Sequence, residues 1–248
     1  MLKKERHAYI IQQINVHNKV LSSDLSVQLT VSEDTVRRDL QELSEEGKLI
    51  KVHGGALSKS FHFTLESPAI YSFPEKRSIA LKAIPLIKDG MLVLLSGGTT
   101  IRELVKALPP DLNATFITVS IPIALELLEH PSSEVIFIGN KLLKNAQMSV
   151  GAEVIQRLSQ IKADICFLGT NSIDANFGIT DLEWEIIEVK KAMIKCANTT
   201  VSLAISEKLN TIQRLQVCTT EEIDVLITEL DPLHPFLQPY LAKGVAIL

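Results

Sequence analysis

The chain has 248 residues, 46% of them hydrophobic, and a formal net charge of −4. This length suits two domains with real hydrophobic cores, and the acidic balance excludes a protein that coats nucleic acid through overall charge. The three cysteines have no CxxC spacing, which favours a reducing cytosol and excludes a zinc motif. The longest uncharged run, residues 112–125, has 14 residues and is too short for a membrane span. The charged start MLKKER is followed by no apolar signal core. We therefore expect a soluble intracellular protein without metal, cofactor or membrane partner.

The first elements along the chain read as two helices. Residues 4–15 carry Ile10, Ile11 and Ile14 on one face. A short second helix, SDLSVQL, places Leu25 and Leu29 four residues apart, and Ser22 or Ser23 is expected to cap it. A tight break at residues 30–32 then leads into a third helix.

The third helix presents two different faces. Ser32 stands at the N-cap position, Glu33 and Asp34 follow in the first turn, and Gly47 is placed to end the helix. An apolar stripe predicts packing against the core; its members are Val36, Leu40, Leu43 and Leu49. The outward residues are Thr35, Arg37 and Arg38. A plain alternative is a solvated face, in which the two arginines pair with Asp34, Asp39 and Glu42.

A basic segment, the wing, follows this helix: Lys51-Val52-His53-Gly54. Three helices and a wing are typical of a winged helix-turn-helix domain, which we place at residues 1–57. In such a domain the third helix reads the major groove, where arginine offers a bidentate fork to guanine or phosphate. The expected DNA-binding residues are Ser32, Thr35, Arg37, Arg38, Lys51, His53 and Gly54.

The rest of the chain divides into a linker and an α/β domain. Residues 58–74 lack periodicity and read as a linker with aromatic anchors at Phe61, Phe63, Tyr71 and Phe73. A helix is expected from Glu75 to about Lys88, with Pro85 late in it. Short apolar runs then alternate with helical stretches; the runs are MLVLLS, FITVS, EVIFIG, DICFLG, TVSLAIS and DVLIT. This alternation predicts a mainly parallel sheet, covered on both faces, over residues 75–248.

Polar residues follow three of the predicted strands: residues 96–100, 118–120 and 169–172. Ligands bind at the carboxyl ends of parallel strands, and Gly98 would let backbone approach an anion at a helix N-terminus. A tight turn with a threonine cap explains the Gly-Gly-Thr-Thr run alone equally well. Three polar strand ends in one sheet favour a pocket that includes Ser120.

Both halves resemble a known family. The stretch VSEDTVRRDLQELSEEGKLIKVHGGA resembles the signature of the DeoR family of bacterial transcriptional regulators, and EKRSIALKAIPLIKDG, SGGTTIRELVKALP and SEKLN resemble its sensor domain. That domain is similar in fold to ribose-5-phosphate isomerase and glucosamine-phosphate deaminase. The resemblance implies a sensor of a phosphorylated sugar or related metabolite, with Gly98, Thr99 and Thr100 cradling phosphate and Lys208 supplying a cation. Lys76 and Lys190 are further candidates. Ser96 and Ile205 stand where the family usually has acids.

Two classes of function follow from these residues. One is a regulator, most simply a repressor of a carbohydrate operon, that binds double-stranded operator DNA as a homodimer or homotetramer in the bacterial cytoplasm and, when DNA-bound, in the nucleoid. The other is a sugar-phosphate isomerase or deaminase that carries an extra domain and uses Glu188, Lys190 and Lys208. Glu188 and Lys190 are two residues apart on a helix and do not face one another. The enzyme also leaves the winged helix unexplained, so we expect the regulator.

Overall fold

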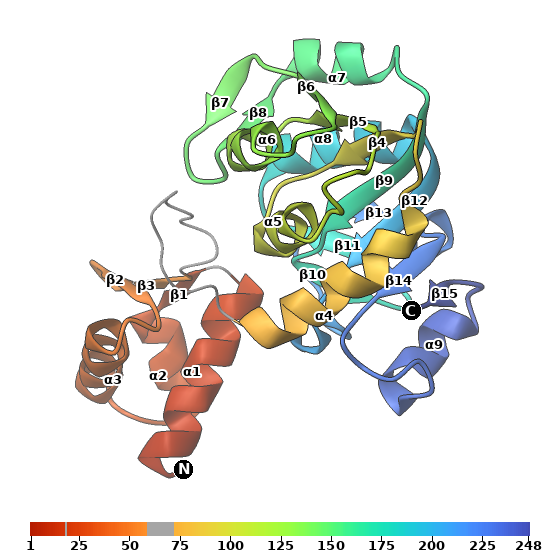
Figure 1. Ribbon diagram of the computed structural model, residues 1–248. Helices are drawn as coiled ribbons and strands as arrows, with labels where there is room; N and C mark the ends of the chain where they lie inside the picture. Colours follow the sequence, from red (N-terminus) through yellow and green to blue (C-terminus); the bar gives the residue numbers. More distant parts are fainter. Residues whose placement is uncertain (18, 59–71) are drawn as a thin grey trace. The chain divides into compact units, whose positions relative to one another are not determined.

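The chain divides into two compact units, Met1–Tyr71 and Ser72–Leu248, and the computed structural model describes residues 1–17, 19–58 and 72–248 (Figure 1). Most of the predicted linker, including Phe61, Phe63 and Tyr71, lies outside these residues. Of its two ends, Ser58 is buried in the first unit, whereas Phe73 is exposed and begins a helix of the second.

The first unit has three helices and a small antiparallel sheet. Its elements are α1 (Lys3–His17), β1 (Lys19–Leu21), α2 (Ser22–Leu29), α3 (Glu33–Glu45), β2 (Ile50–Val52) and β3 (Gly55–Leu57). The strands lie in the order β1-β3-β2, so the predicted wing is the β2–β3 hairpin. This confirms the winged helix-turn-helix fold. The sequence did not predict β1, because three residues whose partners lie more than 30 positions away carry no periodic signal.

The predicted apolar faces form the core of this unit. Its buried members are Ile10, Ile14, Leu25, Leu29, Val36, Leu40, Leu43, Leu49 and Ala56. Ile11 packs against them while partly buried. Ala56 of β3 joins the wing to the same core, so the orientation of the hairpin is tied to that of the helices.

The N-termini of α3 and α2 are capped in different ways. Ser32 caps α3 as expected, and α3 stops at Glu45 ahead of Gly47, whose φ is +71°. The predicted serine cap of α2 is wrong: Leu21 is the N-cap residue and makes no side-chain bond. The Ser22 amide instead donates to the Gly54 carbonyl at 2.8 Å, so the tip of the wing satisfies an amide that a helix start leaves open.

The second unit is built on a seven-stranded sheet in which every pairing is parallel, in the order β15-β14-β12-β9-β4-β5-β6. The strands are β4 (Leu92–Leu95), β5 (Thr115–Thr118), β6 (Glu134–Phe137), β9 (Ala163–Gly169), β12 (Ala197–Leu203), β14 (Val225–Ile227) and β15 (Ala246–Ile247). All six predicted strands are present, and β15, only two residues long, was not predicted. The edge strand β6 departs from the expected double covering, because Ile136 and Phe137 are both 41% exposed.

Helices cover both faces of this sheet (Figure 1). They are α4 (Phe73–Ala83), α5 (Thr99–Lys106), α6 (Ile121–Leu128), α7 (Ala152–Leu158), α8 (Trp184–Lys195) and α9 (Gln238–Leu241). Three of them, α4, α5 and α6, pack together on one face, and α7 packs on α8 at the other. The helix expected to reach Lys88 ends at Ala83 and continues as a 3-10 turn, η1 (Ile84–Leu86), because Pro85 lacks an amide and crowds the preceding turn.

Two small antiparallel sheets were not predicted. One pairs β7 (Lys141–Leu143) with β8 (Met148–Val150), and the other has the order β10-β11-β13. The strands of the second are β10 (Ser172–Asp174), β11 (Gly178–Asp181) and β13 (Leu215–Cys218). Further 3-10 turns are η2 (Ser206–Lys208), η3 (Thr220–Glu222) and η4 (Pro235–Leu237). No helix in the described ranges is long and apolar enough to cross a bilayer.

Candidate functional site

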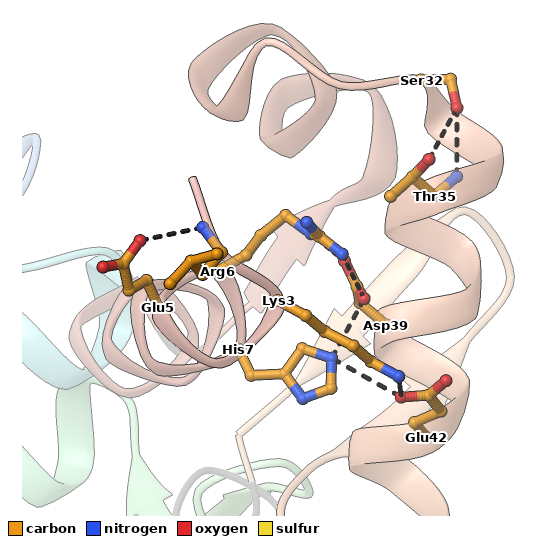
Figure 2. Close-up of polar contacts among 9 residues, drawn as sticks. Lys3, Glu5, Arg6, His7, Ser32, Thr35, Asp39 and Glu42 are labelled. Carbon is orange, nitrogen blue, oxygen red and sulfur yellow. Dashed lines mark hydrogen bonds and ion pairs between the residues drawn. The ribbon is translucent and has the colours of Figure 1, made fainter.

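The N-terminus of α3 is ordered by its own hydroxyl groups. The Ser32 Oγ accepts a hydrogen bond from the Thr35 amide at 3.2 Å and lies 2.9 Å from the Thr35 Oγ1 (Figure 2). Both side chains were predicted to contact DNA, and the structure places them together at the start of α3. The capping bond leaves further lone pairs and a hydroxyl proton for an outside partner.

The two arginines of α3 differ in their partners. Arg37 is paired within the helix, with its Nη2 3.0 Å from the Glu33 Oε2 and its Nη1 3.5 Å from the Asp34 Oδ1. Arg38 is exposed and makes no hydrogen bond or ion pair to any described residue. The alternative of a solvated, paired face therefore fits Arg37 but not Arg38.

The wing lies beside this face of α3. Val52 pairs with Gly55, which leaves His53 and Gly54 as the turn, and Gly54 has φ of +76°. The Lys51 Nζ donates to the Gln41 Oε1 at 2.7 Å. A shallow hollow is shared by the helix and the wing, and its lining residues are Asp34, Arg37, Arg38, Gln41, Glu42 and Lys51. The predicted helix and wing cations thus border one concave surface.

In the second unit, strand order brings the polar strand ends together. The strand β4 lies between β5 and β9, so the chain turns one way from β4 to β5 and the other way to reach β9. Leu95 is in register with Thr118 and Phe167. Such a switch point opens a crevice beyond the carboxyl ends of the strands. Residues 96–100, 118–120 and 169–172 all lie at or just beyond the carboxyl ends of these strands.

The loops at this edge touch one another closely. Gly98, the N-cap of α5, has φ of +116° and ψ of 162°, a conformation that essentially only glycine adopts. A methyl group at Gly97 would lie 3.3 Å from the Ser120 Oγ, and one at Gly169 would lie 2.5 Å from the Gly97 carbonyl. The Ser96 Oγ accepts a hydrogen bond from the Gly169 amide at 2.8 Å, so this serine ties two strand ends together.

Two predicted cationic side chains are buried near one another. Burial and the ammonium of Lys76 lower the pKa of Lys208 to about 7. Burial lowers the pKa of Lys76 to about 8, although the carboxylates of Glu207, Glu75 and Glu103 act to raise it. Within the described chain, the Lys208 ammonium has no hydrogen-bond or ion-pair partner. Two buried cations that repel each other favour an incoming anion.

Sequence reasoning missed a buried carboxylate, Asp181, which pairs with Lys190 and whose charge also acts on Lys208. The Asp181 Oδ2 lies 2.9 Å from the Lys190 Nζ and accepts a hydrogen bond from the Asn171 Nδ2 at 3.2 Å. Burial acts to raise the pKa of Asp181, but Lys190 outweighs it and holds that pKa below its usual range. Lys190 also donates to the Gly169 carbonyl at 3.1 Å, so it is already engaged. The only sequence signal was Gly178-Ile179-Thr180, which ends next to Asp181.

Glu188, the carboxylate considered for catalysis in the enzyme alternative, is paired with Lys191 and not with Lys190 or Lys208. Glu188 is partly exposed, and its Oε1 is 3.0 Å from the Nζ of Lys191. As expected from their spacing, Glu188 and Lys190 do not meet.

Comparisons with known proteins cover both units. Residues 6–61 match the DeoR-like helix-turn-helix domain, and residues 72–230 match the DeoR C-terminal sensor domain. The HTH-type transcriptional repressor GlcR of Bacillus subtilis is 33% identical over 100% of this chain and 96% of its own length. The L-fucose operon activator of Escherichia coli is 27% identical over 92% of this chain and 96% of its own length. A D-ribose-5-phosphate isomerase in complex with phospho-erythronic acid aligns with a TM-score of 0.42 and 18% identity, covering 56% of this chain and 55% of that one.

Proposed function

The chain belongs to the DeoR family of DNA-binding transcriptional regulators, and on that premise we propose that α3 lies in the major groove of operator DNA. The observation that carries the proposal is the exposed guanidinium of Arg38, which has no partner among the described residues and borders the same hollow as Lys51. A guanidinium in the groove binds two acceptors of a guanine, the commonest specific contact to DNA.

The neighbouring residues hold the backbone of the duplex. Arg37 exchanges its bonds to Glu33 and Asp34 for a phosphate, because exposed ion pairs within a helix are weak and a guanidinium can bind two phosphate oxygens at once. Ser32 and Thr35 offer hydroxyls at the helix start, where the dipole favours anions. Lys51, His53 and Gly54 of the wing contact the adjacent strand or minor groove. Contacts of this kind fix the register of the protein on DNA without reading sequence.

We propose that the regulator acts as a homodimer or homotetramer. A symmetric pair presents two α3 helices to two half-sites, whose spacing is one helical turn of DNA or a multiple of it. The relatives support a target among carbohydrate genes: one is named as the activator of the L-fucose operon and another as a transcriptional repressor. We favour repression, in the bacterial cytoplasm.

For the second unit, we propose a phosphorylated sugar or a related metabolite as the ligand. Thr99 and Thr100 offer hydroxyls and open amides at the start of α5, and Gly98 gives the backbone room to approach. Ser120 lies against the same loop. Lys208 and Lys76 provide the positive charge, which burial makes costly in the empty protein and which an anion would compensate.

We propose further that this ligand is bound and not converted. A general base works best with a pKa near the working pH. The pKa of Asp181 is instead held low by Lys190, and Glu188 is paired with Lys191 away from it. The ligand then acts by binding one arrangement of the regulator more tightly than the other.

The test is a gel-shift titration of the full chain on the DNA upstream of its own gene, with and without a panel of sugar phosphates. We expect retardation that one class of sugar phosphate reverses. Trp184 is the sole tryptophan and follows Asp181 by three residues, so its fluorescence gives an independent reading of ligand binding. Absence of retardation at low salt would remove the DNA-binding proposal; retardation without any ligand effect or fluorescence change would remove the sensing proposal.

A further inference from the structure

One acidic residue of α3 faces inward. Asp39 follows Arg38 directly in sequence, but its side chain is only 3% exposed. Burying a carboxylate is costly unless it is paired and hydrogen-bonded. The hydrogen-bond partners of Asp39 therefore influence the orientation of α3 within the first unit.

Arg6 of α1 supplies the main partner. Its Nη2 donates to the Asp39 Oδ1 at 3.0 Å, and its Nε donates to the other carboxylate oxygen (Figure 2). The Arg6 side chain is itself 12% exposed. A two-pronged bond of this kind fixes orientation as well as distance, because both donors lie in one rigid plane.

Neighbouring turns of the same two helices are also joined. The His7 Nε2 lies 3.0 Å from the Asp39 Oδ1, and the Lys3 Nζ lies 2.6 Å from the Glu42 Oε2. His7, Asp39 and Glu42 could together be mistaken for a cation site, since their ligand atoms lie within 4.8 Å of one another. Both oxygens of Asp39 already accept from Arg6, and a metal ion there would sit against the guanidinium. The cluster is an ion-pair network.

We propose that Arg6 is a positioning residue for DNA recognition: through its fork on Asp39 it fixes the rotation of α3 and thereby the direction of Arg38. This rests on the proposed role of α3 as the reader of DNA. The apolar contacts of Val36, Leu40 and Leu43 determine which face of α3 packs on the core, but because such contacts are non-directional they leave the finer rotation of the helix to the directional bonds. Since Arg38 and Asp39 are consecutive on a rigid helix, any rotation at Asp39 moves Arg38 through the same angle.

A buried ion pair seldom adds stability over an apolar pair of similar volume, although removing one partner is costly. A variant that replaces the whole pair by apolar side chains therefore tests the positioning role of Arg6 separately from its contribution to stability. The double variant Arg6→Met with Asp39→Leu replaces the pair by apolar side chains, and we expect it to keep α3 folded. Arg6→Lys keeps the charge and loses the fork. Lys3→Ala is the matched control, since it removes the exposed pair to Glu42 on the same helices.

The assay uses the full chain and a duplex that the unaltered protein selects from a randomised pool, together with a scrambled duplex of equal length. The measured quantity is the ratio of the two affinities, and hydrogen exchange of the α3 amides reports folding. We expect Arg6→Lys and the double variant to lower this ratio about tenfold, or 1.4 kcal/mol, with the α3 amides protected. The salt dependence should not change, because the phosphate-binding cations remain. Lys3→Ala should leave the ratio as it was.

Two results would overturn the proposal. One is an unchanged ratio in the double variant while its α3 amides stay protected. The other is equal loss of both affinities together with loss of amide protection, which would make Arg6 a stabilising residue only. Failure of the proposed function gives a different result, because the unaltered protein would then select no duplex.

Discussion

The most direct test of DNA recognition compares Arg38→Ala with Arg37→Ala. Arg38 has no partner to lose among the described residues, so its truncation should cost specific binding the full value of a bidentate base contact, about 1–3 kcal/mol. Arg37 must first leave Glu33 and Asp34. Exposed pairs of this spacing are worth about 0.3–0.5 kcal/mol each, so the net contribution of Arg37 should be smaller by about 0.6–1 kcal/mol.

For the free energy of unfolding, the same comparison predicts the reverse ranking of the two variants. Arg38→Ala should leave the free energy of unfolding within about 0.5 kcal/mol of the parent, since the side chain is exposed and unpaired. Arg37→Ala should lower it slightly, through the lost helix pairs. Fluorescence anisotropy on a selected duplex gives the affinities, and denaturant titration gives the stabilities. Equal losses of affinity for the two variants, or no loss for Arg38→Ala, would refute this assignment.

Three other predictions follow from the two units. Lys51→Ala should weaken binding to all sequences alike and make the slope of log affinity against log salt shallower by about one; an altered sequence preference would assign Lys51 to base reading instead. Because the pKa of Lys208 is about 7 in the free protein, a phosphate dianion should bind with proton uptake at this lysine. Calorimetry should therefore show affinity falling between pH 7 and 8, with Lys208 contributing up to about one log unit per pH unit, and a shallower fall for Lys208→Ala, in which Lys76, with its pKa of about 8, still titrates. Gly55→Ala places a methyl group 2.0 Å from the Val20 carbonyl and should cost about 1–3 kcal/mol, seen as faster exchange of the wing amides. The control Gly54→Ala meets no atom within 4 Å and should cost less, mainly through its φ of +76°.

Local sequence determined much of this protein. The apolar spacing of Val36, Leu40 and Leu43 fixed which face of α3 packs inward, because helix geometry leaves no other choice. Ser32 and Gly47 marked the ends of that helix through capping chemistry that acts within a few residues. The alternation of apolar runs and helices predicted the six main strands and their parallel sheet.

Pairings between distant residues were decided only by the tertiary structure. The serine cap expected for α2 was replaced by the Gly54 carbonyl from the wing, 32 positions further along the chain. The fork of Arg6 on Asp39 spans 33 positions. Strand order, which places β4 between β5 and β9, likewise depends on which edge each new strand joins. Periodicity and capping patterns indicate the environment of a residue. The identity of its partner depends on how the whole chain folds, and no local pattern carries that information.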